Sequence, residues 1–487
     1  MTRTELSASR RVSVPRGYAI SEDFHLSVAG SKADTADVVE KGEAPLEGVP
    51  LSRIERAWKT VSMGGSVFDG FLLAASQEVG QSILTLPNVF SQVGFAAGIS
   101  MELFFATLAL YTNFLLVSMH AEYRQRLQDD NDPKHQDKFY IASYHEIMGY
   151  LVGPWLRKLS IGVVFLALLG LTTVQIIATS SNFYILDDSF SKRDWSLIWG
   201  FIFSLIAFVP TFRHYRILSV LGILTTTYTA GFMTIASIVH GQDPGTVHEA
   251  PTSPKGFFAG MVQLLFIYGG HSSNVEVADV MDNPASYDRS YFWSYLYVFG
   301  LTMPNAVAGY WAFGQEAEVN ANAFGLFDRS VYRDFGIVMM TLHQAVAFGL
   351  FAGPLFHMWE KMIGVHDRPF IVRALWRLPV EAVMIVFAVA FPFFGAINAI
   401  LGAFTTTFGT YIIPLVGYNL AFSDDKAVNN MVKKFPAWVD MNMVRWLNWF
   451  LAGLILAFGV GAGGFTSVSN FIDKVSQFKF FADCYQC

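Results

Sequence analysis

The chain has 487 residues, of which 53% are hydrophobic and only 15% are charged, and its formal net charge is −6. A soluble protein of this size usually carries about 25% charged residues, so the composition excludes a large soluble helical core. Several apolar runs exceed about 18 residues, the length that crosses a bilayer as a helix. The sequence therefore predicts an all-α polytopic membrane protein, surrounded by membrane lipid and without a nucleic-acid partner.

The first 60 residues differ from the rest of the chain. They carry many charges and contain no apolar run. We therefore expect residues 1–60 to form a disordered cytoplasmic tail, and we expect no cleavable signal peptide.

Hydropathy predicts about eleven membrane spans. If the N-terminus is cytoplasmic, most Lys and Arg residues of the short loops fall on the cytoplasmic side, as the positive-inside rule requires. An odd number of spans then places the C-terminus outside the cell. The predicted spans cover residues 66–93, 95–121, 155–184, 195–211, 215–240, 257–281, 290–313, 333–360, 374–394, 396–421 and 444–466.

The two cysteines, Cys484 and Cys487, form a CxxC pair at the end of the chain. Such a pair can be a disulfide, a redox pair or half of a metal site. No second CxxC or histidine pair completes a zinc site, so we expect no metal. An oxidising exterior favours a disulfide, and an inert tail is the alternative.

No predicted loop is long enough to hold a soluble domain. The loop at residues 122–153 contains an amphipathic stretch, Phe139–Tyr150, which predicts a short helix on the membrane surface. We therefore expect the function of the protein to reside within the spans.

Polar residues interrupt two of the spans. The first span reads DGFLLAASQEVGQSILTLPNVFSQVG (Asp69–Gly94), and the sixth contains IYGGHSSNVE (Ile267–Glu276). Glycine costs about 1 kcal/mol against alanine in a helix, and an ionisable group at membrane depth needs a cavity or a partner. Both spans are therefore predicted to be broken helices that line a site.

The two interrupted spans lie five spans apart, in corresponding places of two halves. This pattern is typical of a transporter built from inverted repeats, with its site at the middle of the membrane. We predict a first five-helix repeat at residues 61–242 and a second, inverted repeat at 255–422. Residues 423–487 then hold the eleventh span and a short extracellular tail.

Three residues suggest the chemistry of the predicted site. Ser82 is predicted to cap the outer half of the first span, whose amides and positive dipole end would suit a carboxylate. His271 titrates near neutrality when unperturbed and is the natural proton carrier; a neutral, buried histidine that satisfies a carbonyl is the alternative. Glu78 has no Lys or Arg at mid-span to pair with, so we expect it to bind a proton in some states or to contact a cationic or donor group.

Other residues of the spans complete the predicted site. His343 is a second candidate for proton binding, with a structural role as the alternative. Gln175 is costly to bury, and Tyr268 and Phe348 are candidate walls for a flat apolar substrate. The predicted substrate-binding set is Gln77, Glu78, Gln81, Ser82, Gln175, Tyr268, His271, Ser273, Asn274 and Phe348, and the predicted proton-coupling set is His271, Glu78 and His343.

Characteristic motifs are spread over the spans. They are GGSVFDG (64–70), ILTLPNVFSQVG (83–94), HYRILSVLG (214–222), TTYTA (226–230), ASIVHGQ (236–242), YGGH followed by NVE (268–276), YWAFG (310–314), PLFHMWEKMIGVHD (354–367) and FPFFGAIN (391–398). Together they resemble the plant auxin influx carriers of the amino acid/auxin permease family. The resemblance implies a fold similar to the leucine-transporter-like amino acid transporters, a 5+5 inverted repeat with helices 1 and 6 broken. It also implies proton-coupled uptake of indole-3-acetic acid at the plasma membrane.

The resemblance also assigns residues. It implies that His271 is the family's functional histidine and that Gln77 and Gln81 belong to the substrate region of the first helix. Protons are the coupling ion, no cofactor is expected, and we expect a monomer.

The chain departs from the family pattern near the predicted site. The family's glutamine appears as Glu78, its Ala-Val-Thr after the histidine appears as Ser272-Ser273-Asn274, and a later histidine appears as Asp279. An extra carboxylate repels an anionic substrate unless it is protonated, and it can instead receive an ammonium group. The leading hypothesis is therefore proton-coupled import of indole-3-acetic acid or a close aromatic carboxylate. A proton-coupled permease for an amino acid such as tryptophan is the alternative.

A third hypothesis comes from another class of protein. The N-terminal tail is long enough for a membrane nutrient or hormone sensor that signals into the cytosol. We expect no enzyme, because no catalytic cluster lies outside the spans and the polar residues within them lack a nucleophile–base pattern.

Overall fold

The computed structural model describes residues 65–78, 80–132, 134, 141–208, 215–279 and 281–476, and all regular elements within these ranges are helical. The predicted tail at residues 1–60 and the pair Cys484 and Cys487 lie outside the described residues. In chain order the helices are α2 (Val67–Glu78), α3 (Ser82–Val93), α4 (Phe95–Asp129), α6 (Tyr144–Leu151), α7 (Pro154–Leu186), α8 (Lys192–Ser204), η1 (Leu205–Phe208), α9 (Tyr215–His240), α10 (Pro254–Ile267), α11 (His271–Asp279), η3 (Pro284–Ser286), α12 (Tyr287–Phe313), η4 (Gly314–Glu318), η5 (Ala323–Leu326), α13 (Val331–Met362), α14 (Phe370–Ala390), α15 (Phe394–Ile400), η6 (Leu401–Ile412), α16 (Ile413–Ala421), α17 (Asp425–Asn429), α18 (Met441–Ile455), η7 (Leu456–Gly464) and α19 (Phe465–Ser476).

Each predicted span coincides with a helix or with consecutive helical pieces in the described part of the chain. Six of these helical stretches are by themselves long and apolar enough to cross a membrane. The all-α polytopic class expected from the composition is therefore confirmed. The six stretches are Phe95–Asp129, Pro154–Leu186, Leu218–His240, Val331–Met362, Phe394–Ala421 and Met441–Ser476.

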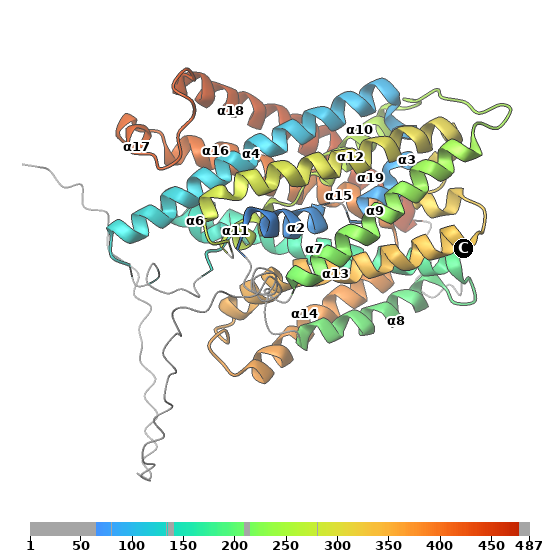
Figure 1. Ribbon diagram of the computed structural model, residues 1–487, viewed down its shortest axis with the longest axis horizontal. Helices are drawn as coiled ribbons and strands as arrows, with labels where there is room; N and C mark the ends of the chain where they lie inside the picture. Colours follow the sequence, from blue (N-terminus) through green and yellow to red (C-terminus); the bar gives the residue numbers. More distant parts are fainter. Residues whose placement is uncertain are drawn as a thin grey trace, which may run out of the picture. The chain divides into compact units, whose positions relative to one another are not determined.

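The first and sixth spans are both broken at mid-length, as predicted. The first span consists of α2 and α3, separated near Gly80, and the sixth consists of α10 and α11, separated at residues 268–270. The two broken spans run antiparallel, because α3 packs against α10 while α2 packs against α11 (Figure 1). This antiparallel pairing brings the two breaks to the same level of the helical bundle.

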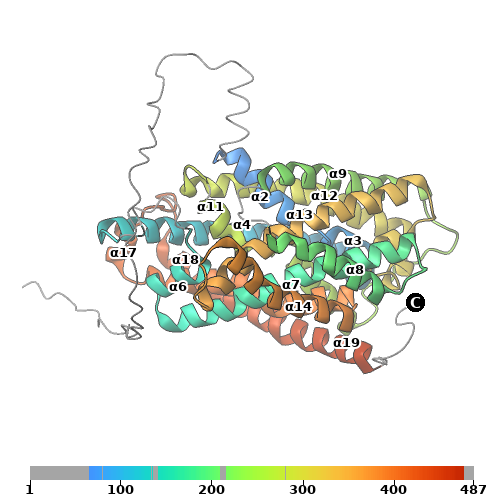
Figure 2. The same ribbon diagram turned by 90° about the horizontal axis from the view of Figure 1, so that it is seen from below.

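Long unbroken helices surround the two breaks. α12 packs against α2, α3 and α9, and α13 packs against α7 and α9. α8 and α14 pack together beside α7, on the side away from α4 and α12 (Figures 1 and 2). Among the surrounding elements, α12 packs most extensively against the broken spans, and α4, α9 and η6 also pack against them.

One face of α12 carries a row of tyrosines. Tyr287, Tyr291 and Tyr295 are spaced by four residues, which places them on one face of a helix. All three side chains are buried. We call this row the tyrosine ladder, and its hydroxyl groups point toward α2 and α11, as the contacts below show.

The amphipathic helix predicted at residues 139–150 is present from Tyr144 as α6. Its first turn is closed by a capping box, in which Ser143 caps the helix and its backbone amide donates to Glu146 Oε2 at 2.9 Å. The first two residues of the predicted helix, 139 and 140, lie outside the described residues.

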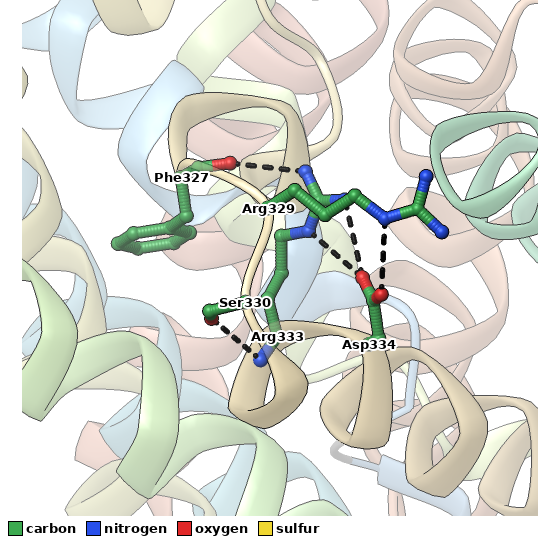
Figure 3. A network of polar contacts seen from close by, with 5 residues as sticks. All are labelled: Phe327, Arg329, Ser330, Arg333 and Asp334. Carbon is green, nitrogen blue, oxygen red and sulfur yellow. Dashed lines mark hydrogen bonds and ion pairs between the residues drawn. The ribbon is translucent and has the colours of Figure 1, made fainter.

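A polar network fixes the start of α13. The Ser330 hydroxyl accepts the Arg333 amide at 3.2 Å, and Arg333 Nη1 donates to the Phe327 carbonyl at 3.1 Å. Arg333 Nη2 also lies 3.1 Å from Asp334 Oδ1, so the guanidinium joins the preceding loop to the first turn of the helix (Figure 3). The network holds the loop against α13, the helix that carries His343.

Candidate functional site at two helix breaks

A small cavity of about 20 Å³ lies where the two helix breaks meet. A space of about 10–15 Å³ already admits a water molecule, whereas ligand pockets usually measure about 300 Å³ or more. In this conformation the cavity has room for water, and it must widen before it can hold an indole-sized ligand. Its lining residues are Gln77, Glu78, Gln81, Ser82, Leu171, Phe266, Ile267, Gly269, Gly270 and Phe351.

The first break contributes four predicted site residues to this cavity: Gln77, Glu78, Gln81 and Ser82. The prediction that Ser82 caps α3 is wrong. Gln81 is the N-cap, with a helical backbone (φ −63°, ψ −13°) and no side-chain capping bond, so the chain already follows the helical path before Ser82. The Ser82 carbonyl accepts the Thr85 hydroxyl at 3.0 Å. Because no side chain caps α3, its first amides keep their capacity to bind an anion.

The second break approaches the first at a glycine. A Cβ at Gly270 would overlap the Glu78 carboxylate, so this approach requires a residue without a side chain. The predicted residue Ser273 does not line the cavity; its hydroxyl instead donates to Gln77 Oε1 at 2.7 Å. Ser273 therefore ties α11 to α2, beside the cavity.

Glu78 is the acidic group of the cavity and is 5% exposed. No charged partner accompanies it among the described residues. The Tyr295 hydroxyl lies 3.4 Å from Oε2, while Oε1 lies against Gly270 and has no side-chain or backbone donor within hydrogen-bond geometry. An unpaired carboxylate is costly at this depth, so Glu78 presents an oxygen that is open to a proton or to a donor group of a ligand.

His271 lies behind the cavity wall and is fully buried. Its Nε2 is 3.0 Å from Thr112 Oγ1, and its Nδ1 is 3.1 Å from the Tyr291 hydroxyl. Both ring nitrogens therefore have hydroxyl partners, one from α4 and one from the tyrosine ladder. The predicted histidine is close to the site but reaches the cavity only through other side chains.

His343 approaches the first break from α13. Its Nδ1 lies 3.1 Å from the Gly222 carbonyl and 2.8 Å from Thr226 Oγ1. Its Nε2 is buried and has no hydrogen-bond partner among the described residues, and a Cβ at Gly80 would lie 3.6 Å from it. When Nδ1–H donates to the carbonyl, Nε2 is the acceptor nitrogen, so His343 offers a free acceptor to the first break.

The predicted aromatic walls do not line the cavity in this conformation. The Tyr268 hydroxyl donates to Glu102 Oε1 at 3.2 Å, because a buried phenol needs an acceptor and α4 supplies one. Phe348 instead packs on Phe203, with 5.0 Å between ring centroids. Phe351, about one turn further along α13, takes the position at the cavity.

Two predicted amide residues support the site from behind. Gln175 Nε2 donates to Gln81 Oε1, so it holds a lining side chain in place. Asn274 donates to Asn113 Oδ1 at 3.1 Å and accepts the Tyr287 hydroxyl at 3.0 Å. Asn274 therefore joins α11 to α4 and to the tyrosine ladder, and it does not line the cavity.

One buried acid near the second break is not among the residues predicted from the sequence. Glu102 of α4 is 0% exposed, and its Oε1 accepts the hydroxyls of Thr302 (2.6 Å) and Tyr268 (3.2 Å). The available signal was an acidic residue inside the apolar segment 95–121. Among the described residues no group of three or more His, Cys, Asp and Glu side chains is placed to hold a metal ion.

Comparison with known proteins identifies relatives over most of the chain. Auxin transporter-like protein 1 of Medicago truncatula is 39% identical over 429 residues, covering 87% of this chain and 88% of that protein. Auxin transporter protein 1 of Arabidopsis thaliana is 39% identical over 429 residues, covering 87% of each chain. Auxin transporter-like protein 2 of rice, Oryza sativa subsp. japonica, is 37% identical over 470 residues, covering 94% of this chain and 96% of that protein.

The fold and the family follow from two further matches. The crystal structure of the Eremococcus coleocola manganese transporter covers 88% of this chain with a TM-score of 0.54, at 12% sequence identity, so the likeness concerns the fold alone. The family model of the transmembrane amino acid transporter proteins matches residues 63–463. The chain therefore belongs to the transmembrane amino acid transporter protein family, together with these auxin transporter-like relatives.

Proposed function

We propose that the protein imports indole-3-acetic acid, or a close aromatic carboxylate, together with protons across the plasma membrane. The observation that carries the proposal is the cavity at the uncapped start of α3, which faces an apolar wall formed by Leu171, Ile267 and Phe351. Uncapped helix amides favour a carboxylate, and the apolar wall suits a flat ring. The names of the relatives, auxin transporter and auxin transporter-like proteins, support the same substrate class.

In this proposal protons are the coupling ion and no other cofactor takes part. Glu78 accepts a proton at the cavity, and His271 accepts one behind it. The unpartnered Nε2 of His343 makes this residue a third candidate, at the first break. Substrate binding and proton binding both favour a widened cavity, so each ligand increases the affinity for the other.

The proposal includes an orientation and a location. The N-terminus faces the cytoplasm and the C-terminus faces the exterior of a plasma membrane, in line with the positive-inside rule. The proposed working unit is a monomer.

One observation favours a second substrate class. The Glu78 carboxylate lines the cavity without a charged partner, and an ammonium group would supply one. This favours an amino acid such as tryptophan over an anion that lacks an ammonium group.

Competition for uptake distinguishes the two substrate classes. Labelled indole-3-acetic acid and labelled tryptophan are offered to proteoliposomes at two external pH values, with a panel of unlabelled amino acids as competitors. If indole-3-acetic acid is the substrate, Glu78→Gln leaves its affinity unchanged or improves it, because a repelling charge is removed. If an amino acid is the substrate, the same change weakens its binding by about tenfold, the typical loss of a charged hydrogen bond. If the unchanged protein takes up neither compound, the proposal is contradicted.

A further inference from the structure

We propose that Glu78 and His271 form one proton-binding unit, connected by the hydroxyl groups of Tyr295 and Tyr291. The inference rests on the proposed function, since it assigns the route by which a proton from the cavity reaches a histidine that does not touch the cavity. It gives the two tyrosines a role that neither sequence motifs nor cavity lining indicates.

The four groups form a continuous chain of contacts. Glu78 Oε2 lies 3.4 Å from the Tyr295 hydroxyl, which lies 2.6 Å from the Tyr291 hydroxyl. The Tyr291 hydroxyl lies 3.1 Å from His271 Nδ1. Tyr295, Tyr291 and His271 are at most 2% exposed, so the route is shielded from water along its length. We call this chain the tyrosine relay.

Counting hydrogens shows that the relay can carry a proton. In the starting state Glu78 is protonated and donates to Tyr295, Tyr295 donates to Tyr291, and Tyr291 donates to His271 Nδ1. The Nε2–H of His271 donates to Thr112 Oγ1, whose own hydrogen binds the Leu108 carbonyl at 3.1 Å. Each hydroxyl donates one hydrogen and accepts another, as its chemistry allows.

The transfer reverses each bond of the relay and creates no new contact. The Glu78 proton moves to the Tyr295 oxygen, the Tyr295 proton moves to Tyr291, and the Tyr291 proton moves to Nδ1 of His271. Both tyrosines are neutral before and after the transfer. The net result is one carboxylate at Glu78 and one imidazolium at His271, while the Nε2–H bond to Thr112 is unchanged.

A competing bond shows where the relay is interrupted. The Tyr295 hydroxyl also lies 2.7 Å from the Tyr268 carbonyl, which is closer than Glu78. Since Tyr295 has one hydrogen, a bond to Tyr268 takes that hydrogen out of the relay. Tyr268 belongs to the second helix break, so the geometry of this break determines whether the relay is connected.

Other titratable groups lie on the helices around the relay. On α11 itself Glu276 and Asp279 follow His271, and Asp279 is paired with Arg124 and His120 of α4. Among the other titratable groups on helices packed against α2, α11 and α12 are Glu102 of α4, Glu146 of α6, His343 and Lys361 of α13, and Tyr411 of η6. In the described part of the chain, no hydrogen bond or ion pair joins any of these groups to Glu78 or to His271, whereas Tyr295 contacts Glu78 and Tyr291 contacts His271.

The tyrosine ladder provides its own control. Tyr287 shares the face, the burial and the residue type of Tyr291 and Tyr295, but its hydroxyl donates to Asn274 Oδ1 at 3.0 Å. It therefore stands outside the relay. A purely structural role would make the three tyrosines equivalent, whereas the relay distinguishes Tyr287 from the other two.

The experiment compares Tyr291→Phe, Tyr295→Phe and Tyr287→Phe in proteoliposomes of the full chain. Substrate exchange at equal pH on both sides measures folding and binding, and acid-driven accumulation with substrate-dependent proton uptake measures coupling. We expect Tyr291→Phe and Tyr295→Phe to lose coupling by about tenfold or more, as for a missing proton-transfer group. Their exchange should stay within about twofold of the unchanged protein, because the ring is retained. Tyr287→Phe should retain both activities.

The outcomes separate the relay from the proposed function. If the unchanged protein exchanges substrate but takes up no protons with it, the proposed proton coupling fails and so does the relay. If the unchanged protein is coupled and Tyr291→Phe or Tyr295→Phe remains fully coupled, the relay alone is wrong. Equal loss in all three variants also overturns it. Should a phenylalanine variant lack exchange, trifluorotyrosine at position 291 keeps the hydroxyl and lowers its pKa, and an unchanged pH profile of coupling would then refute the relay.

Discussion

At the scale of single residues, Gly270 sets how closely the two broken spans approach. A Cβ there would overlap the Glu78 carboxylate. We expect Gly270→Ala to cost about 1–3 kcal/mol of stability, the usual cost of overpacking, and to abolish uptake, because the two breaks must separate. Gly300 of α12 is the matched control, since a Cβ there meets no atom within 4 Å. Thermal unfolding and uptake of both variants test this, and equal behaviour of the two would contradict it.

Single residues also show what a sequence can predict about this site. Gln77, Glu78 and Gln81 were identifiable because a polar group in an apolar span stands out in any conformation. Tyr268 and Phe348 were predicted as walls, but the direction of an aromatic ring depends on the helix phase beyond the break. That phase is set by packing partners such as Glu102, which no local pattern connects to Tyr268.

At the scale of helices, Asp279 fastens the end of α11 to its neighbours. Its Oδ1 lies 2.6 Å from Arg124 Nη2 and 2.8 Å from His120 Nε2, and its Oδ2 accepts the Ala142 amide at 2.5 Å. The Asp279 side chain is fully buried. The Asp279 carboxylate therefore connects α11 to α4 and to the segment before α6.

We predict that Asp279→Asn lowers the free energy of unfolding by about 3 kcal/mol, because removal of one partner leaves the other charge of a buried pair without compensation. The measurement is thermal or denaturant unfolding of the purified protein. Asp425→Asn is the control, since Asp425 is 93% exposed and 3.8 Å from Arg445, and such pairs contribute about 0–1 kcal/mol. A loss for Asp279→Asn no larger than for the control would show that the connection is not stabilising.

The helices themselves were largely predictable, and their ends were less so. Apolar length gives the spans, and glycine with polar residues gives the two breaks. The prediction that Ser82 caps α3 was wrong. It relied on the general preference for serine at helix starts, which does not specify the residue at which the helix begins. The backbone at Gln81 is already helical, and this depends on how α3 packs against α10 and α12.

At the scale of the whole molecule, we expect the stability to fall in mild acid because of His145 in α6, a helix that lies outside the predicted spans. Burial, together with the positive charges of Lys361, Arg157 and Lys134, lowers the pKa of His145 from 6.5 to about 4. Because the folded pKa is below the unfolded one, the unfolded chain binds the proton first. The contribution of His145 is therefore complete above pH 6.5 and is lost as the pH falls toward 4. Burial raises the pKa of Glu146, but the charges of Lys361 and Lys134 outweigh this effect and hold the pKa below its usual 4.5. Glu146 therefore does not change the stability with pH until the pH falls below 4.5.

A neutral substitution of His145 tests whether this residue lowers the free energy of unfolding as the pH falls. We expect His145→Gln to reduce the loss of unfolding free energy between pH 7 and pH 5 by on the order of 1–2 kcal/mol, since one pKa unit corresponds to about 1.4 kcal/mol. Melting temperatures of both proteins at the two pH values provide the measurement. A steeper pH dependence in the variant would reverse the assignment.

The architecture of the molecule followed from two interrupted spans in corresponding places, a pattern that local sequence displays directly. The conformational state of the molecule could not be predicted from the sequence. The central cavity has a volume of about 20 Å³, and that volume depends on how the side chains of five helices pack. The boundaries of the two repeats, at 61–242 and 255–422, stay a prediction.

The tyrosine ladder has an electrical consequence. Tyr291 and Tyr295 are four residues apart, a spacing that we call one rung of the ladder. One rung corresponds to about 6 Å along a helix, or about one fifth of a hydrocarbon core of about 30 Å. In the proposed orientation Tyr291 is the inner rung, so a proton that passes from Glu78 to His271 moves inward through part of the membrane field. A full crossing corresponds to about 2.3 kcal/mol per 100 mV, and one rung therefore to about 0.5 kcal/mol. A negative interior would favour the protonated histidine about twofold for each 100 mV, which makes the loading of this transporter depend on voltage as well as on pH.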